Sequence, residues 1–468
     1  MMDRRLVSSL GLAFLLGGAA HALGANLNVD STQDSPDAKP GDGLCVSKAG
    51  GCTLRAAIEE ANATELSDTI NVPPGTYKLS VPSGGGPDFA QSGSLFLNGE
   101  VQILGGEAAQ TIIDGGGKVR VFETEKDSTI SLLGLTIQNG LADGANGGGI
   151  LNRGHLKLAD VVITGNRAKA DPLNANGGGG GLSNADSGNA TLLNVHVKDN
   201  TADGRGGGIA NNGALQIMNS TVSGNASLTD DGGGVQNDGT LSLLISEVAD
   251  NRAKSGAGIN NLKGELKLTD STLAGNKASS DGGALFNSGT VTAVSTTISG
   301  NSAGGVGGGI ANRAEGKVDL NNVTIASNSA GTGSGAQGGG IANAATATVI
   351  AANSILAANT AGNGADCAGV LTSKGYNLIQ SAAGCTISGD TAGNVVAQDA
   401  KLAVLAKNDG PTRTQALGAG SPAIDAGNPG KPTGSDGTCS RADQRGVARD
   451  QVGRCDIGAF EQGAKPAH

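Results

Sequence analysis

The chain has 468 residues, of which 81 are glycine; aromatic residues make up only 2% of it and tryptophan is absent. This composition is unlike that of a globule with a thick aromatic core, and it indicates a narrow interior lined by aliphatic side chains with many tight corners. The formal net charge is −10, which excludes the basic proteins that bind nucleic acid through their overall charge.

Residues 1–22 have the pattern of a secretory signal peptide. Arg4 and Arg5 precede an apolar run that ends at Leu16, and a small-x-small cleavage pattern ends at Ala22. The apolar run is too short to span a bilayer as a helix. We therefore expect an exported protein with no transmembrane segment in its mature chain, located outside the cell, at the cell surface or in the periplasm.

The six cysteines predict disulfide bonds, because an even number of cysteines in an exported chain favours oxidised pairs. A zinc site would call for a CxxC motif or a nearby histidine, and neither is present. Cross-pairing among the last four cysteines stays open at this point. The local pairs are Cys45 with Cys52, Cys367 with Cys385, and Cys439 with Cys455.

Residues 23–68 are expected to form an N-terminal cap with a short helix. The segment CTLRAAIEEAN contains apolar residues at helical spacing, and Thr53 is suited to the N-cap position. A short helix over an open end would hide apolar surface and strand edges. The alternative is a helix that docks a partner. The apolar stripe consists of Leu54, Ala57, Ile58 and Ala61.

One unit of sequence recurs eight times between about residues 128 and 360, a period that indicates a solenoid. Each copy is anchored on a small residue, and an asparagine follows twelve positions later. The anchors are Gly154, Gly188, Gly213, Gly239, Gly264, Gly289, Gly316 and Ala347, and the asparagines are Asn166, Asn200, Asn225, Asn251, Asn276, Asn301, Asn328 and Asn359.

The spacing of aliphatic residues within this unit predicts a bend between two strands. Positions two and four after the anchor are aliphatic, which is the period of a strand, and position nine is aliphatic again. A straight strand cannot change the parity of its inward face. Position six is a short polar residue in seven copies, of a kind that favours turns, with Ile245 as the exception.

A third strand, with the pattern GGGI-x-N, precedes each anchor. Three strands and three turns make one coil of a single-stranded parallel β-helix, and residues 69–360 would form about 12 coils, the first of them less regular. One coil buries too few aliphatic side chains to offset the cost of ordering its backbone. The coils must therefore stack.

Residues 361–468 are expected to form the final irregular coils and a disulfide-stapled C-terminal cap. The segments GPTRTQALGAGSPAIDAG and CDIGAFE bracket a stretch rich in proline and glycine. The charged residues Asp425, Arg445, Asp456 and Glu461 are natural members of a salt-bridged cap. The alternative is a catalytic carboxylate pair.

Parallel β-helices can carry polysaccharide lyases and glycoside hydrolases, so candidate catalytic groups need to be named. Asp230 and Asp231 lie on a loop, and Arg205 and Arg252 lie one coil away on the same predicted loop edge. A hydrolase needs two carboxylates across the scissile bond. A lyase needs a basic residue and usually calcium held by an acidic cluster, which is the one case in which a cofactor is expected.

Other candidate binding features have structural explanations. His196 stands at position eight after its anchor, where side-chain types are mixed, which predicts an outward surface residue. The glycine runs are not followed by Lys-Ser or Lys-Thr as in a phosphate-binding loop. Phe286 is expected to point outward and alone, so no flat aromatic platform for sugars is evident.

Three motifs together resemble bacterial right-handed parallel β-helix repeat proteins that are secreted or displayed at the cell surface. CTLRAAIEEAN followed by DTINVPPGTY resembles the CSLREA-type N-terminal motif, although Thr53 and Ala56 stand where that name spells Ser and Glu. The GGGI-x-N and TxSGN units resemble polymorphic outer-membrane protein repeats. SPAIDAG with DIGAFE resembles the choice-of-anchor Q region. The resemblance implies right-handed coils, as the rule for parallel crossovers also does.

The sequence thus predicts a secreted or surface-exposed, non-enzymatic scaffold for adhesion or extracellular interaction, with no cofactor. Its partner would be an extracellular glycan or a component of a cell surface, and not nucleic acid. The alternative is a polysaccharide lyase or glycoside hydrolase that acts from the loop edge.

Overall fold

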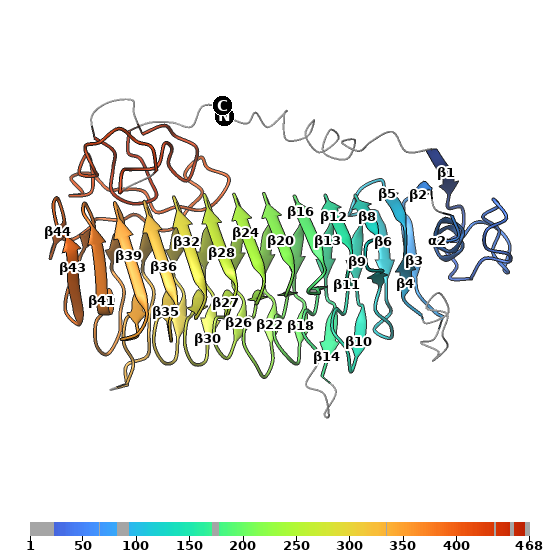
Figure 1. The fold of residues 1–468 in the computed structure, drawn as a ribbon, viewed down its shortest axis with the longest axis horizontal. Coiled ribbons are helices and arrows are strands. Elements are labelled where there is room, and N and C mark those ends of the chain that lie inside the picture. The colour runs from blue at the N-terminus through green and yellow to red at the C-terminus, as the bar shows by residue number, and fades with distance from the viewer. Residues whose placement is uncertain are drawn as a thin grey trace. The chain divides into compact units, whose positions relative to one another are not determined.

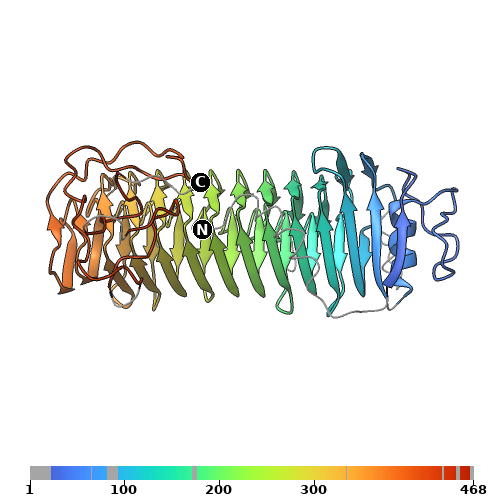
Figure 2. The same cartoon turned by 90° about the horizontal axis from the view of Figure 1, so that it is seen from above.

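The computed structural model describes residues 23–64, 66–81, 93–170, 177–333, 335–434, 437–449 and 454–463 (Figures 1 and 2). The predicted signal peptide, residues 1–22, lies outside these ranges. The chain forms two compact units, an N-terminal unit that ends at Thr221 and a C-terminal unit that begins at Val222.

Both units consist of coils whose equivalent strands pair in parallel, as predicted for a parallel β-helix (Figure 1). Each regular coil has four strand positions, which we number as rows in chain order. Row 1 holds the GGGI-x-N strand, row 2 the five residues after the anchor, row 3 the segment after the bend, and row 4 a short strand after the repeated asparagine. Row 4 is an addition to the three strands expected.

The strands of the N-terminal unit fall into these rows as follows. Row 1 contains β4 (Leu95–Leu97), β7 (Phe122–Thr124), β11 (Ile150–Asn152), β15 (Leu182–Asn184) and β19 (Ile209–Asn211). Row 2 contains β1 (Leu23–Asn28), β2 (Ser67–Val72), β5 (Glu100–Gly105), β8 (Thr129–Leu133), β12 (His155–Ala159), β16 (Asn189–Leu193) and β20 (Ala214–Met218). Row 3 contains β3 (Gly75–Lys78), β6 (Thr111–Asp114), β9 (Thr136–Gln138), β13 (Val162–Thr164) and β17 (His196–Lys198). Row 4 contains β10 (Leu141–Asp143), β14 (Arg167–Lys169) and β18 (Thr201–Ala202). The next row 3 strand, β21 (Thr221–Ser223), contains the boundary between the two units.

The C-terminal unit continues the same order of strands along its own coils. Row 1 contains β23 (Val235–Asn237), β27 (Ile259–Asn261), β31 (Leu285–Asn287), β35 (Ile310–Asn312) and β38 (Ile341–Asn343). Row 2 contains β24 (Thr240–Leu244), β28 (Glu265–Thr269), β32 (Thr290–Val294), β36 (Lys317–Asn321), β39 (Thr348–Ala352), β41 (Cys367–Lys374) and β43 (Cys385–Asp390). Row 3 contains β25 (Glu247–Ala249), β29 (Thr272–Ala274), β33 (Thr297–Ser299), β37 (Thr324–Ala326), β40 (Ile355–Ala357), β42 (Leu378–Ile379) and β44 (Val395–Val396). Row 4 contains β22 (Ala226–Ser227), β26 (Arg252–Ala253), β30 (Lys277–Ala278) and β34 (Ser302–Ala303).

The predicted bend is present between rows 2 and 3. The residue at position six has a positive φ in every repeat, which is the left-handed conformation that asparagine and aspartate adopt more readily than other non-glycine residues. Ile245 adopts it too, with φ 51°, although a β-branched side chain is strained there. The other bends are at Asp160, Asn194, Asn219, Asp270, Ser295, Asn322 and Asn353.

Two ladders of buried asparagines run inside the coils. In the C-terminal unit the amide of Asn276 donates to Asn301 Oδ1 at 2.9 Å and accepts from Asn251 at 3.0 Å. The asparagines that end the row 1 strands form a second ladder, in which the side chain of Asn261 donates to Asn287 Oδ1 at 2.8 Å. The ladders satisfy backbone groups at corners where no strand partner is available. The repeated asparagines therefore stabilise the stack from within.

The predicted N-terminal helix is α2 (Leu54–Asn62), and it packs against β1, β2 and β4 where the coils of the N-terminal unit begin. Thr53 caps it as expected, since its hydroxyl accepts the Ala56 N–H at 3.1 Å. The polar side of the helix is buried as well. Arg55 pairs with Asp34 at 2.6 Å, and both helix glutamates accept N–H groups of the loop before the helix. No face is left exposed for a docking partner.

The region expected to form the C-terminal cap covers the outer face of row 3 along several coils of the C-terminal unit (Figure 1, in red). Gln444 accepts from the Thr297 hydroxyl at 2.6 Å, and the Thr272 hydroxyl donates to the Arg413 carbonyl at 2.6 Å. Phe460 and Ile457 pack on the row 3 residue Ile355. The region therefore covers row 3 from the side and shields its outward side chains from solvent. We call residues 399–463 the C-terminal segment.

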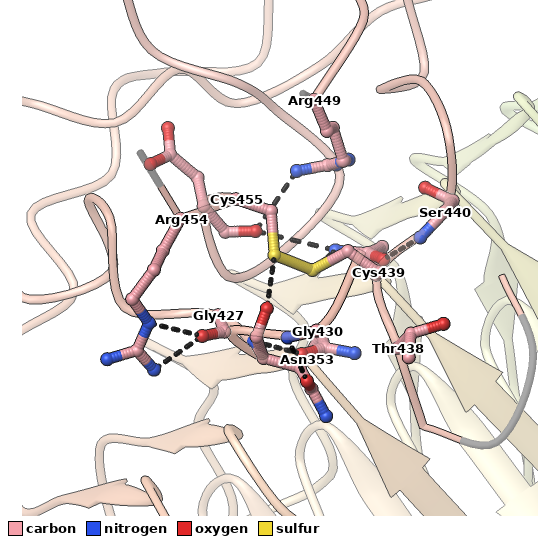
Figure 3. The surroundings of a disulfide bond; sticks show 12 residues. Asn353, Gly427, Gly430, Thr438, Cys439, Ser440, Arg449, Arg454 and Cys455 are labelled. Atoms are coloured by element: carbon pink, nitrogen blue, oxygen red, sulfur yellow. Dashed lines mark hydrogen bonds between the residues drawn. A yellow bond between two sulfur atoms is a disulfide. The ribbon is translucent and has the colours of Figure 1, made fainter. Parts of the chain in front are cut away.

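The three disulfides join the cysteines as paired from the sequence, namely Cys45 to Cys52, Cys367 to Cys385, and Cys439 to Cys455. No cross-pairing occurs among the last four. Figure 3 shows the third bond beside Asn353, whose side chain donates to the Gly437 carbonyl at 2.8 Å. The disulfides indicate an oxidising, extracytoplasmic compartment. No helix among the described residues has the length and apolar character needed to cross a membrane.

Candidate functional site

The loop carboxylates considered as catalytic groups bind neighbouring backbone. Asp231 Oδ1 accepts the Ser255 N–H at 3.0 Å, and Asp230 Oδ1 accepts the Asp231 N–H at 3.0 Å. Both are half-buried, whereas Arg252 is exposed in β26. Arg205 is exposed and belongs to the other unit. These contacts fit side chains that hold a loop to the next coil.

Of the carboxylates expected in the C-terminal cap, Asp456 and Glu461 lie buried in the C-terminal segment. Arg449 pairs with Glu461 at 2.7 Å, and Arg445 pairs with Asp443 at 2.8 Å. Burial raises the pKa of Glu461 to about 7, with Arg449 opposing the shift. Of the residues predicted to form a salt-bridged cap, Arg445 and Glu461 are in ion pairs, with Asp443 and Arg449 as partners that sequence reasoning did not include. Asp425 is exposed, and its backbone N–H donates to Asp456 Oδ1 at 2.7 Å.

A groove lies over the row 1 strands β11 and β15 of the N-terminal unit. The middle residue of each row 1 strand points away from the interior, yet Leu151, Ser183, Gln236 and Asn260 are all buried. In the N-terminal unit this groove opens into a hollow of about 550 Å³ over β11 and β15.

Charged side chains from both walls of the groove meet on its floor. Arg120, before β7, and Arg153, after β11, both pair with Glu123 on β7. Arg120 also donates to the carbonyls of Asn146 and Gly147, each at 2.9 Å. Burial lowers the pKa of Arg120, and the charge of Glu123 opposes that shift. Arg120 and Glu123 thus form a fixed base for the site.

Two cations in this hollow retain donors for a ligand. Within the described residues the guanidinium of Arg153 bonds only Glu123, and its side chain is 39% exposed. Lys126 is exposed on the same hollow, and Asp186 lies on the lining as well. The hollow and its floor hold three cationic groups and two carboxylates. The remaining polar lining consists of Asn146, Ser183, Ser187 and Asn212.

Row 1 of the C-terminal unit carries a different polar floor. Asn260 donates to Gln236 Oε1 at 2.7 Å, and Gln236 donates to Asp238 at 2.8 Å. Among the described residues, the buried Asn260 Oδ1 has no hydrogen-bond partner. The half-buried Phe286 is on the next strand, as the register with Asn260 shows. The outward position x of GGGI-x-N was the available signal for this floor, and sequence reasoning missed it.

Phe286, predicted to be outward and alone, does point outward, and it lies beside this amide pair. An ion pair is formed nearby by Arg313, after β35, and Asp281, before β31, at 2.8 Å.

His196 is exposed, as predicted, and lines a second hollow of about 400 Å³ in the N-terminal unit. Its Nδ1 lies 2.7 Å from Thr221 Oγ1. Partial burial and then the charge of Lys198 lower its pKa, so the neutral ring is favoured. Asp160 and Glu107 line the same hollow.

Among the described residues no three or more His, Cys, Asp or Glu side chains are grouped as metal ligands. No protein-family model matches this sequence, and no curated protein matches it significantly.

Proposed function

We propose that this protein is an extracytoplasmic β-helix scaffold that binds an acidic glycan in the row 1 groove of its N-terminal unit. The observation that supports this proposal most directly is the 550 Å³ hollow into which Arg153 and Lys126 present unused donors. A guanidinium can bind a carboxylate or sulfate with two parallel hydrogen bonds. Side-chain amides and hydroxyls around it suit the hydroxyl groups of a sugar.

The groove favours a glycan over an added polypeptide strand. Row 1 strands have partners on both sides, since β11 pairs with β7 and with β15. No free strand edge is available on the floor to bind a peptide backbone. A ligand in this groove must therefore be recognised by side chains, and the cationic side chains present here suit an acidic saccharide.

A binding role is favoured over catalysis for this groove. Glu123 is the carboxylate at the floor, and it is held between Arg120 and Arg153. Both ion pairs occupy the oxygens of this carboxylate, which fits a structural role on the floor better than contact with a scissile bond. The proposed activity is thus adhesion or capture at a surface.

The place of action is proposed to be outside the cell or at its surface. The predicted signal peptide supports export. The resemblance to CSLREA-type, polymorphic outer-membrane protein and choice-of-anchor Q sequences supports a secreted or displayed β-helix repeat protein with right-handed coils.

A glycan array containing uronate, sulfated and neutral oligosaccharides tests the proposal with the chain from residue 23 onward. We expect acidic glycans to bind, and Arg153→Gln with Lys126→Gln to weaken binding by about tenfold or more. Arg120 still pairs with Glu123 in that variant, so the floor remains neutralised. Arg167→Gln is the matched control, because Arg167 is exposed and pairs with Asp203 outside the hollow.

Binding of neutral glycans alone, or equal binding by wild type and the double variant, would contradict the proposal. Reducing or unsaturated sugar ends that appear on incubation, and disappear in Asp231→Ala, would instead support the lyase or hydrolase alternative.

A further inference from the structure

The C-terminal segment shows what kind of ligand the outer face of row 3 accepts. Position eight of three covered coils is a threonine whose hydroxyl bonds this segment, and in the coil of Ile355 the contact is apolar instead. The Thr272 hydroxyl donates to the Arg413 carbonyl, the Thr297 hydroxyl donates to Gln444, and the Thr324 hydroxyl accepts the Ala459 N–H at 3.0 Å. Irregular polypeptide is thus bound side-on by a row of outward side chains.

The bend residues of the same coils form the second half of this interface. Ser295 Oγ donates to the Ala442 carbonyl at 3.0 Å, and Asn322 Oδ1 accepts the Ser440 N–H at 2.7 Å. Asn353 Oδ1 accepts the Asn428 N–H at 2.9 Å. Bend and position eight together therefore present donors and acceptors that match a polypeptide backbone.

Arg413 of the C-terminal segment forms an ion pair with the coils. Arg413 Nε donates to Glu247 Oε1 at 2.7 Å, and Glu247 stands at position eight of its coil. The neighbouring Thr412 hydroxyl donates to the Asp270 carbonyl at 3.1 Å. The dipeptide Thr412-Arg413 is thus held by the carboxylate of Glu247 and by the backbone carbonyl of the bend residue Asp270.

The N-terminal unit has the same two kinds of position, and the described part of the chain does not fill the space over them. Its bends Gly134, Asp160 and Asn194 and its position-eight residues Val162 and His196 line the hollow of about 400 Å³. Asp160, Asn194 and His196 are exposed.

Two carboxylates give this hollow a preference for a cation. Glu107 is exposed and accepts from Gln110 at 3.0 Å, and Asp160 accepts from the amide of Asn194. Both line the hollow, whereas no lysine or arginine is among the residues that line it. A ligand that carries an arginine would complement it, as Arg413 complements Glu247.

We propose that this hollow docks an arginine-bearing polypeptide segment of a separate protein, in the way that the C-terminal segment docks on its own unit. The arginine would lie against Glu107 and Asp160, and backbone groups would meet Asn194 and His196. The scaffold would then hold a protein partner on a face different from the row 1 groove.

A fluorescent peptide that copies residues 407–416, KNDGPTRTQA, provides a probe for binding to the full chain by fluorescence anisotropy. We expect saturable binding that falls about tenfold when Glu107→Gln is combined with Asp160→Asn, and by a similar factor when the arginine of the peptide is replaced by alanine. Both substitutions preserve side-chain size, and asparagine suits the bend. Asp143→Asn, an exposed position on β10 that lines neither hollow, should leave the affinity unchanged.

Absence of binding at millimolar peptide would overturn the proposal, as would equal affinity of the double variant and wild type. Analytical ultracentrifugation of the full chain tests whether a second copy of this protein, and not a separate protein, occupies the hollow. Self-association that the same double variant abolishes would show that the hollow binds a second copy, and would overturn the separate partner.

Discussion

Replacing one asparagine of the inner ladder by alanine should destabilise the C-terminal unit by several kcal/mol. Asn276 is fully buried, and its side chain takes part in four hydrogen bonds. It accepts from the Asn251 N–H at 3.1 Å and from the Asn251 amide at 3.0 Å, and it donates to Val248 O at 3.0 Å and Asn301 Oδ1 at 2.9 Å. At about 1 kcal/mol net for each bond, the loss is about 4 kcal/mol, and buried groups left unpaired would add to it.

Equilibrium urea unfolding followed by far-ultraviolet circular dichroism measures this loss for Asn276→Ala. Asn212→Ala is the matched control, since Asn212 is exposed and only its backbone N–H bonds to a neighbouring coil, at Asn184 O. Its cost should stay within about 0.5 kcal/mol, as for ordinary surface sites. If Asn276→Ala cost less than 1 kcal/mol, or no more than the control, the ladder would not be a principal source of stability.

Three further predictions concern strain, redox state and pH. Ile245→Asn should raise the melting temperature, because about 1–2 kcal/mol of left-handed backbone strain is relieved; a lower melting temperature would show that the lost apolar contacts of Ile245 outweigh it. Reduction of Cys439–Cys455 should speed hydrogen exchange in the C-terminal segment and leave the N-terminal unit unchanged, and unchanged exchange in both would contradict this. Burial, with Asp443 adding to it, raises the pKa of Asp270 to about 7, so the folded state holds a proton that the unfolded state releases. The resulting stability is present in full below about pH 4 and is lost as pH rises through about 7, so calorimetry should give a lower melting temperature at pH 8 than at pH 5, and a smaller difference in Asp270→Asn.

The coil could be predicted because the repeats within one chain act as an alignment. The change of parity between positions four and nine required a bend, and the bend lies at position six even where Ile245 occupies it. Inward positions such as Leu215 and Ile217 are buried, as their period indicated. These features depend on local spacing, which a sequence shows directly. Proximity in sequence indicated the local disulfide pairs, and the structure settled the pairing of the last four cysteines, which the sequence had left open.

Row 4 and the C-terminal segment were less accessible to this reasoning. A two-residue strand such as β26 is too short to show any period, and small residues such as Ala253 and Ala278 carry its inward side. The C-terminal segment has no repeat, and its contacts link residues more than 100 positions apart, as between Thr297 and Gln444.

One signal for that contact was present at position eight. Thr272, Thr297 and Thr324 recur there, and they are buried under the C-terminal segment, although an outward position on a solvated face would be exposed. The recurrence of threonine at position eight in these three coils was therefore the available signal for the polypeptide that covers them. The outward side of row 1 had a comparable signal in the buried polar residues Ser183, Gln236 and Asn260.

The row 1 groove as a binding site for acidic glycans is the central functional claim, and a crystal structure with a bound uronate oligosaccharide tests it most directly. The prediction is electron density for the sugar over β11 and β15, with a carboxylate within hydrogen-bond distance of Arg153 and of Lys126. An empty groove at saturating oligosaccharide, or sugar bound only at another face, would contradict it.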